Sequence, residues 1–487
     1  MADTIIFKTK DGKSFEVIKE IKGRGLKKNV FFSADRTFVI GVYKENPDGA
    51  SLDRLEDLVE KYKMDIFNKD GSEYWAKRFC WPTHIVKSPA GKTGLVFPIY
   101  PSNYFFTKGN QKGLEKKASW FTKPLVRKEL DSDELGNWLN YLLCCLHLSR
   151  TIRRMHAAGL AHSDLSFNNV LIDPLTGSIL VIDIDELVVP GKYMPGVIGT
   201  RGFVAPEVLK TQSLSINDTN KSLPCRATDL HALACLVYLY LLKRHPLEGR
   251  KVHDSNPDID DLLLLGEKAI FVESSKDNSN TPFTEKYQPI DWSDVKKLPY
   301  TITGSFIAKL IKQAFEDGLH NPTLRPSAGE WEDAIIKTLD MVVPCQNSSC
   351  KEKYFVLNKN KTCPFCLTKI NIQIPVIDLY KKDSKSDNYY FTKTQIIGHH
   401  FKKLYIWHFY SNKYLSELNP KNERPFVAYL QFHNNKWYFV NKLINNLFYN
   451  DNINEYSLPV NAHCEINEKT IITVKEPYGF QLKFKSI

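Results

Sequence analysis

One stretch of the sequence constrains the fold more than any other. It is a loop that runs His162-Ser163-Asp164-Leu165-Ser166-Phe167-Asn168-Asn169, followed by an apolar strand that ends Val181-Ile182-Asp183. At this spacing Asp164 can accept a proton from an attacking hydroxyl, and Asn169 offers a neutral oxygen ligand for magnesium. Asp183, at the end of the strand, can bridge phosphates through the same metal. The pattern predicts a phosphoryl-transfer site.

A second motif follows downstream, Gly199-Thr200-Arg201-Gly202-Phe203-Val204-Ala205-Pro206-Glu207. It resembles the end of a protein-kinase activation segment. With the two motifs in this order, the chain resembles the protein-kinase family, and the resemblance covers roughly residues 1–340. The resemblance implies a two-lobed α+β fold, ATP and Mg²⁺ as cofactors, and a protein substrate. It makes Asp164 the catalytic base, Asn169 and Asp183 the magnesium ligands, and Thr200 a residue of the substrate site.

Composition sets wider limits. With 487 residues, of which 43% are hydrophobic, the chain is long enough for two or three domains with cores of their own. The net charge is +11, but the lysines are scattered among Asp and Glu residues, which favours a solvated surface over an acidic partner such as a nucleic acid. The N-terminus lacks the apolar core of a signal peptide, and the apolar runs are too short to cross a membrane. We expect a cytoplasmic protein.

The nucleotide is expected to lie against Gly23-Arg24-Gly25-Leu26-Lys27-Lys28-Asn29-Val30, in which Gly23, Gly25 and Val30 match a Gly-rich loop. Lys28 stands where the third glycine is expected, and the loss of a glycine would loosen the phosphate clamp. The apolar strand Leu95–Tyr100 falls where a kinase has its interlobe hinge, so Phe97 and Ile99 are expected to contact ATP.

The lysine that pairs with the α- and β-phosphates is predicted to be Lys44, at the end of Gly41-Val42-Tyr43-Lys44. A register three residues earlier would place Gly41 there instead and leave the position without a lysine. The acidic partner on the next helix is expected to be Glu56 or Glu60. Two scaffold features also match: Asp229 is expected to brace the catalytic loop, and Glu207 to form a buried ion pair with Arg325.

Four cysteines cluster with metal-ligand spacing: Cys345, Cys350, Cys363 and Cys366. Two thiolate pairs on two knuckles are typical of a zinc ribbon, whose closed tetrahedral site is structural. The alternatives are two disulfides or four buried thiols, and a reducing compartment favours Zn²⁺.

After the cysteines the chain becomes rich in aromatic residues, with alternating runs such as Phe426–Leu430 and Lys436–Val440 that predict an all-β sandwich. The order of kinase, ribbon and β domain resembles a bacterial subfamily encoded beside tellurite-resistance-type von Willebrand A proteins and a PP2C phosphatase. His245–Gly249, Gly266–Val272 and Cys363–Cys366 carry this resemblance. It implies those two proteins as partners and a forkhead-associated-like tail, for which an interaction domain that binds no phosphate is the alternative.

The predicted organisation is a two-lobed kinase fold, a Cys₄ ribbon and a β sandwich, over residues 1–100 (N-lobe), 101–341 (C-lobe), 342–370 (ribbon) and 371–487 (sandwich). The predicted function is a serine/threonine protein kinase that uses ATP and magnesium. One alternative is a pseudokinase scaffold. It is motivated by Lys28, by Ser163 in place of the Arg that usually precedes the catalytic Asp, by Ser166 where many protein kinases carry a Lys, and by the two possible registers at Lys44. The other is a small-molecule phosphotransferase, because those enzymes share the Asp–Asn–Asp pattern.

Overall fold

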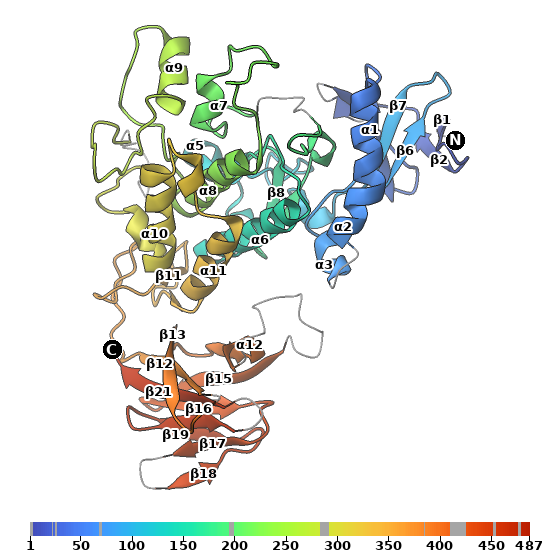
Figure 1. Cartoon of the computed structure of the whole chain (residues 1–487). Helices are drawn as coiled ribbons and strands as arrows, with labels where there is room; N and C mark the ends of the chain where they lie inside the picture. Colours follow the sequence, from blue (N-terminus) through green and yellow to red (C-terminus); the bar gives the residue numbers. More distant parts are fainter. Residues whose placement is uncertain are drawn as a thin grey trace. The chain divides into compact units, whose positions relative to one another are not determined.

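The computed structural model describes residues 3–21, 23–24, 27–67, 71–193, 199–282, 292–383, 385–409, 425–450, 454–475 and 479–487. The chain divides into two compact units (Figure 1). The first comprises residues 1–136, 140–300 and 309–332, and the second comprises residues 137–139, 301–308 and 333–487.

The first unit begins with a seven-stranded sheet in the order β2-β1-β6-β7-β5-β4-β3, in which every neighbouring pair is antiparallel. Its strands are β1 (Thr4–Lys8), β2 (Ser14–Ile18), β3 (Gly23–Arg24), β4 (Lys28–Phe32), β5 (Phe38–Tyr43), β6 (His84–Lys87) and β7 (Thr93–Pro98). Alternation along the strands buries one side of the sheet, where Phe7, Val17, Ile40 and Val96 belong to one core cluster.

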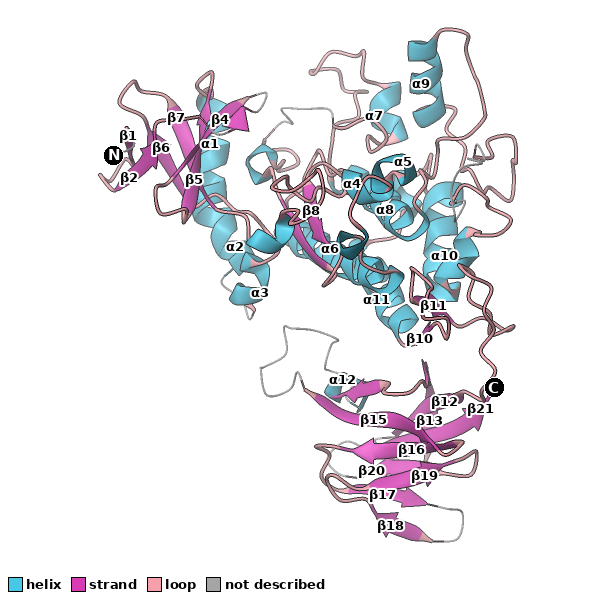
Figure 2. Cartoon of the chain, turned by 180° about the vertical axis from the view of Figure 1, so that it is seen from behind, coloured by secondary structure: helices cyan, strands magenta, loops and turns pink. Residues whose placement is uncertain are grey.

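A helical segment lies alongside this sheet (Figures 1 and 2). It runs without a break through α1 (Gly49–Asp57), η1 (Leu58–Tyr62) and α2 (Lys63–Phe67), and α3 (Ser72–Ala76) follows. Asp48 caps its start by accepting a hydrogen bond from the backbone N–H of Ser51 at 2.8 Å. Leu55, Leu58 and Tyr62 are buried, as the helical periodicity of this segment predicts.

The larger lobe is mostly helical. Its elements are η2 (Ser102–Tyr104), α4 (Ser119–Thr122), α5 (Pro124–Arg127), η3 (Ser132–Glu134), α6 (Trp138–Ala157), β8 (Val170–Asp173), β9 (Ser178–Val181), η4 (Ile184–Glu186), α7 (Pro206–Lys210), α8 (Arg226–Leu242), α9 (Pro257–Leu265), η5 (Tyr300–Thr303), α10 (Ser305–Lys312), η6 (Gln313–Asp317), η7 (Pro322–Leu324) and α11 (Ala328–Leu339). Almost every residue of α8 is buried, so this apolar run is a core helix, as expected from its length. No described helix is long and apolar enough to span a membrane.

The second unit contains a short hairpin, the cysteine cluster and two antiparallel sheets. The hairpin pairs β10 (Val342–Pro344) with β11 (Tyr354–Val356). One sheet has the order β13-β12-β21-β20-β17-β18 and the other the order β14-β15-β16-β19. Their elements are β12 (Pro375–Lys382), β13 (Tyr389–Ile397), β14 (Lys403–Tyr405), α12 (Ile406–Phe409), β15 (Phe426–His433), β16 (Lys436–Asn441), β17 (Leu447–Asn450), β18 (Glu455–Ser457), β19 (His463–Ile466), β20 (Ile471–Val474) and β21 (Phe480–Ser486).

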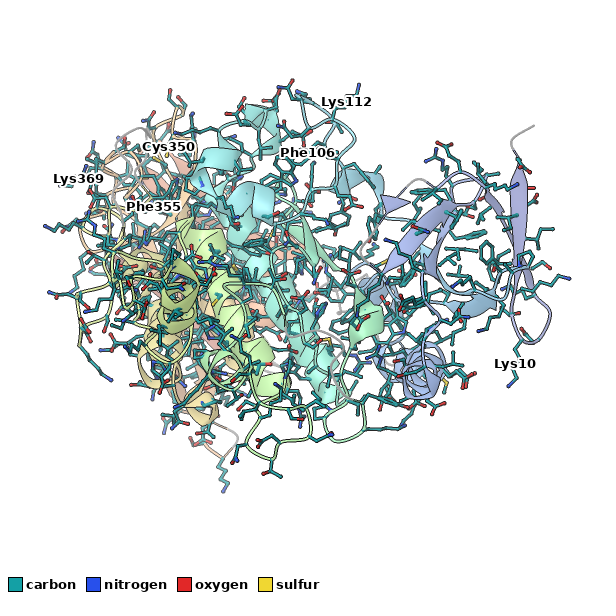
Figure 3. All side chains as sticks on the ribbon, turned by 90° about the horizontal axis from the view of Figure 1, so that it is seen from above. Lys10, Phe106, Lys112, Cys350, Phe355 and Lys369 are labelled. Atoms are coloured by element: carbon teal, nitrogen blue, oxygen red, sulfur yellow. The ribbon has the colours of Figure 1, made fainter. Side chains whose placement is uncertain are left out.

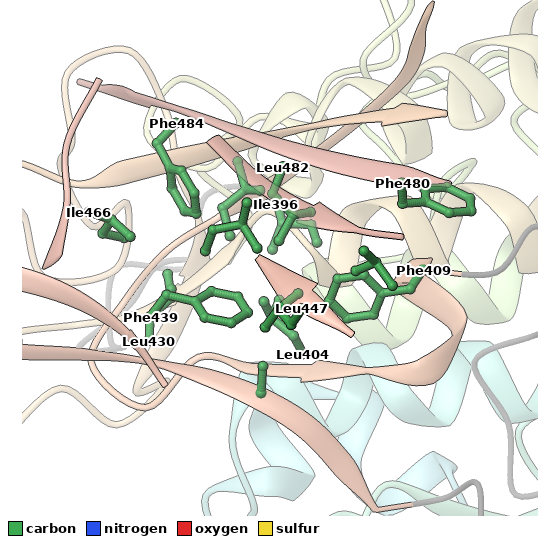
Figure 4. Packing of buried hydrophobic residues seen from close by; sticks show 14 of the residues in the cluster. Ile396, Leu404, Phe409, Leu430, Phe439, Leu447, Ile466, Phe480, Leu482 and Phe484 are labelled. Atoms are coloured by element: carbon green, nitrogen blue, oxygen red, sulfur yellow. The ribbon is translucent and has the colours of Figure 1, made fainter. Parts of the chain in front are cut away.

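The two sheets share one hydrophobic core (Figure 4). Phe439 of one sheet and Leu482 of the other are both completely buried in it, together with Leu404 and Ile472. Burying side chains of this size from both sheets is what holds such a domain together, at about 1.5–3 kcal/mol for each large apolar residue. The alternating pattern seen in the sequence therefore corresponds to an all-β domain with an inner face on each sheet.

Candidate functional site

The catalytic loop lies between α6 and β8 and is held from below by the first turn of α8. Asp229 accepts hydrogen bonds from the backbone N–H groups of His162 at 2.8 Å and Ser163 at 3.3 Å. On the other side of the loop, His162 Nε2 contacts the carbonyl oxygen of Ile182 at 3.0 Å. The predicted bracing role of Asp229 is confirmed, and these bonds fix the backbone that presents Asp164.

Asp164 is in direct contact with two of the other predicted site residues. Its carboxylate accepts a hydrogen bond from Thr200 Oγ1 at 2.7 Å and another from Asn169 Nδ2 at 2.9 Å. The same Asn169 amide donates to the Asp164 backbone carbonyl at 2.8 Å. Because the amide nitrogen is used in this way, the Asn169 carbonyl oxygen is left as the atom that can bind a cation.

Asp183 follows β9 and lies in the left-handed region, with φ of 57°. This conformation ends the strand and turns the carboxylate into the cavity that Asp164 and Asn169 also line. The side chain is accessible from the cavity, yet the surrounding protein desolvates it and raises the pKa of this carboxyl, an effect that Lys28 opposes. A cation between Asp183 and Asn169 would remove that cost.

A cavity of about 500 Å³ opens in front of these residues, between the sheet and the helical lobe. This volume is typical of small-molecule and cofactor sites. Four of the residues predicted to contact the nucleotide line it: Gly23, Val30, Phe97 and Ile99. Gly25, also predicted there, lies outside the described residues.

The structure does not bring Lys44 into this cavity. Strand β5 ends at Tyr43, and Lys44 is exposed beyond it, beside a neighbouring cavity at the start of α1. Successive side chains of a strand point to opposite faces, and Val39 and Gly41 are the β5 residues that line the nucleotide cavity. Position 44 has the opposite parity, so of the two registers the observed one places Gly41, and not Lys44, against this cavity.

Lys28 lines the cavity instead, and sequence reasoning missed it. Its ammonium contacts both carboxylate oxygens of Asp185, at 2.7 and 2.6 Å, and Asp185 also accepts a hydrogen bond from the Tyr43 hydroxyl at 2.6 Å. Burial lowers the pKa of Lys28, but the carboxylates of Asp185, Asp183 and Glu186 together outweigh burial and hold the pKa above its ordinary value, so the side chain is a cation. The signal in the sequence was a lysine at the third glycine position.

The acidic residues predicted on the following helix do not face the site. Glu56 and Glu60 are both exposed. The buried residue on this side of α1 is Arg54, whose guanidinium lies 3.7 Å from Glu186. Lys27 contacts the same carboxylate at 3.0 Å. The helix therefore presents a cation, Arg54, toward the turn that contains Asp183, Asp185 and Glu186 (the metal-binding turn of the prediction), and the acidic side chains come from that turn.

Below the site, Arg325 and Glu207 form the predicted ion pair. Two parallel hydrogen bonds of 2.8 Å join the guanidinium to the carboxylate. The Arg325 side chain is 1% exposed, and it also donates to the backbone carbonyls of Gly318, Leu319 and Ala227. This arrangement ties the segment after Thr200 to the end of the helical lobe.

Replacing Arg325 with Met is expected to lower the free energy of unfolding of this unit by about 3–5 kcal/mol, because Glu207 and three buried carbonyls lose their partner. Urea unfolding followed by fluorescence measures the change. Lys210→Met is the matched control, because its ion pair with Glu267 is exposed and such pairs contribute about 0–1 kcal/mol. Equal losses in the two variants would contradict a special role for the buried pair.

The four predicted cysteine ligands come together in the second unit. The Sγ atoms of Cys345, Cys350, Cys363 and Cys366 all lie within 4.8 Å of one another, with 3.4 Å between Cys345 and Cys366. None of them is in a disulfide. Cys350 and Phe355, labelled in Figure 3, belong to one buried cluster that also includes Cys363, and Cys345 and Cys366 pack against it. Each cysteine offers one sulfur to a common centre, which is the arrangement of a metal site.

Comparison with known proteins agrees with the geometry around Asp164. Residues 129–331 match the family model of the protein kinase domain. This segment of the chain is similar to the protein kinase domain. The matched segment holds Asp164, Asn169, Asp183 and Thr200.

Similar proteins of known function are serine/threonine-protein kinases. RAD53 of Saccharomyces cerevisiae is 29% identical over 104 residues, which cover 20% of this chain and 13% of that protein. The kinase ppk21 of Schizosaccharomyces pombe is 31% identical over 120 residues, which cover 22% of this chain and 18% of that protein. The matches thus span less than a fifth of either relative.

Among solved structures, ROP2 of Toxoplasma gondii is described as a virulence factor with a protein-kinase fold and no enzymatic activity. It aligns with a TM-score of 0.40 at 14% identity, over 68% of this chain and 82% of that one. The kinase domain of a Toxoplasma gondii rhoptry antigen aligns with a TM-score of 0.37 at 16% identity, over 54% and 79% of the two chains.

Proposed function

We propose that this chain is a serine/threonine protein kinase that uses ATP and magnesium. The observation that carries the proposal is the contact of Asp164 with both Asn169 and Thr200, at the edge of a cavity that Asp183 shares. The site thus brings together a base, two oxygen ligands for a cation and a residue of the substrate segment. They meet where an acceptor hydroxyl could approach bound ATP.

Each residue has a role that follows from its chemistry. Asp164 accepts the proton of the acceptor hydroxyl, and the Thr200 hydroxyl holds the carboxylate in place for it. Asn169 and Asp183 would hold magnesium, which would supply positive charge to neutralise the phosphates when bound. The apolar walls at Val30, Phe97 and Ile99 would enclose the adenine.

A protein substrate is favoured over a small molecule by the segment that ends at Glu207. Thr200 in this segment contacts Asp164, and Glu207 anchors the segment to Arg325. An acceptor site built from a segment anchored at both of these residues suits a peptide chain. The similarity to serine/threonine-protein kinases supports the same class.

The test is phosphate transfer by the purified chain from γ-labelled ATP, with magnesium or with excess EDTA. We expect label on Ser or Thr of the chain itself or of a generic protein acceptor, located by mass spectrometry and absent with EDTA. Label on a small hydroxyl compound and none on protein would establish the small-molecule alternative. Nucleotide binding without transfer to any acceptor would establish the scaffold alternative.

We further propose that the cysteine cluster is a structural zinc ribbon. The four sulfurs fit the ion, because tetrahedral coordination with Zn–S distances of about 2.3 Å places sulfurs about 3.8 Å apart. The observed contacts of 3.4 Å between Cys345 and Cys366 and 3.9 Å between Cys350 and Cys363 are close to that value. Four protein ligands would leave no open position, so the ion would hold the fold and take no part in the reaction.

The β domain is proposed to be a forkhead-associated-like interaction domain. Its two antiparallel sheets with a common core support this assignment at the level of architecture. The order of domains leads us to propose a cytoplasmic protein of the bacterial subfamily named above, with a PP2C phosphatase and a von Willebrand A-type protein as partners. Co-purification of the full chain with each candidate partner tests this.

A further inference from the structure

We propose that Lys28, in place of Lys44, holds the α- and β-phosphates of ATP, and that Asp185 is the residue that positions it. This inference rests on the proposed function and names the cation of that site. The usual arrangement takes the lysine from the strand that corresponds to β5 and its acidic partner from the following helix. In this chain the lysine comes from β4, and its acidic partner comes from the turn that follows Asp183.

The first argument is the location of the Lys28 ammonium. Lys28 lines the same cavity as Asn169 and Asp183, and its Nζ lies 5.5 Å from the centre of the Phe97 ring. Its contacts with Asp185 use two of the three N–H bonds of the ammonium. The third remains for a phosphate oxygen, which a cation at this place in the cavity would bind strongly.

The second argument is the room that Gly41 provides. Strands β4 and β5 are antiparallel neighbours, with Val30 opposite Gly41 and Lys28 opposite Tyr43. A Cβ atom added at Gly41 would lie 3.4 Å from Lys28 Cδ and 3.6 Å from the Phe97 ring. The side chain that is missing from β5 is therefore replaced, in the same space, by the stem of the lysine from β4.

The third argument is the partner. Asp185 is completely buried, and Tyr43 donates a hydrogen bond of 2.6 Å to it. A buried carboxylate held by a fixed hydroxyl donor is a rigid anchor for an ammonium. The helix after β5 offers no described acid at this place, since Arg54 is the residue it buries there and Glu56 is exposed. The anchor thus lies two residues after Asp183, in the metal-binding turn itself.

The experiment compares Lys28→Met with Lys44→Met in the full chain. The dissociation constant for ATP with magnesium and kcat/KM for transfer are measured for both. We expect Lys28→Met to lower kcat/KM by about 10²–10³-fold, as the loss of one charge-stabilising group does, and Lys44→Met to stay within about twofold of the wild type. A large loss in Lys44→Met with little change in Lys28→Met would overturn the assignment.

The role of Asp185 is tested by a double-mutant cycle. Asp185→Asn keeps an acceptor for Tyr43 but loses the charge that orients Lys28, and we expect it to weaken ATP binding in the wild-type background. In the Lys28→Met background it should have no further effect, because the residue it positions is gone. An equal loss in both backgrounds would show a merely structural role and overturn the positioning claim.

The double variant Lys28→Met/Asp185→Asn also covers the case in which Lys28→Met does not fold, because it leaves no unpaired buried charge. If it folds, as judged by its melting temperature, and retains wild-type kcat/KM, Lys28 does not hold the phosphates. The exchange variant Lys28→Gly/Gly41→Lys provides a gain-of-function arm. Recovery of activity relative to Lys28→Gly would support the shared-space argument, and no recovery in an exchange variant that folds would count against it.

These outcomes are separable from a failure of the proposed function. A wild type that binds ATP but transfers no phosphate would refute the kinase activity, and the dissociation constants of the Lys28 and Lys44 variants would still decide which lysine contacts the nucleotide. A wild type that binds no ATP would refute both.

Discussion

Replacing Asp164 with Asn is expected to lower kcat for phosphate transfer by about 10²–10⁴-fold, with little change in the KM for ATP. The amide has the shape of the carboxylate, and its oxygen can still accept the 2.7 Å hydrogen bond from Thr200. The side-chain contact with Asn169 Nδ2 is lost, but that amide still donates to the backbone carbonyl of residue 164 at 2.8 Å, so the loop should keep its structure. It cannot take up the proton of the acceptor hydroxyl, however, and only the chemical step should suffer. Initial rates of label transfer at several ATP concentrations separate the two parameters.

The matched control for this experiment is Asp133→Asn. This aspartate lies in the same lobe, is 69% exposed and forms a surface ion pair with Lys108, so its replacement should leave both parameters unchanged. If Asp164→Asn retained the wild-type kcat, another group would have to accept the proton. If it raised KM alone, Asp164 would contribute to binding and not to the chemical step.

Replacing Cys363 with Ser is expected to remove the zinc from the protein and to unfold the ribbon. Cys363 is completely buried in the cluster with Phe355 and Ile370, and a hydroxyl is a poor replacement for a thiolate ligand. Binding of structural zinc contributes about 10–16 kcal/mol of folding free energy in small zinc domains. The packing of the short hairpin alone could not replace this stabilisation. Metal analysis by mass spectrometry should find about one zinc per wild-type chain and almost none in the variant.

Cys464→Ser is the control, because Cys464 is also buried in the second unit but lies outside the cluster. This variant should keep its zinc. Nucleotide binding by Cys363→Ser should also persist, because the residues of the nucleotide cavity all belong to the first unit. A wild type without metal, whose intact mass shows the loss of four hydrogens, would contain two disulfides and would contradict the zinc proposal.

The residues that the sequence predicted well are those whose roles depend on short spacings. Asp164 and Asn169 lie on one loop, and Asp183 lies at the end of the next hairpin, so local structure alone brings them together. The pair of Glu207 and Arg325 was also predictable although its members are far apart, because each lies in a motif of its own. The cysteines follow the same logic, with two ligands on each knuckle.

The predicted residues that do not line the cavity are those whose placement depends on the register of a strand or on the rotation of a helix about its axis. Lys44 and Gly41 were both compatible with the spacing, and a shift of three residues changes which face of β5 a side chain occupies. The helix after β5 was predicted correctly, but its phase places Arg54 toward the site and Glu56 toward solvent. Lys28 could be assigned only when the pairing of β4 with β5 showed the space that Gly41 leaves.

The shared space at Gly41 has a consequence for how catalytic domains are sorted by alignment. If Lys28 holds the phosphates as proposed, its ammonium reaches the cavity from β4 over the space that Gly41 leaves on β5, so an aligned column that lacks its lysine does not by itself mean an inactive enzyme. A lineage could move its lysine between two such strands in two single substitutions. The useful criterion is then the position of the charge within the cleft, whichever strand supplies it.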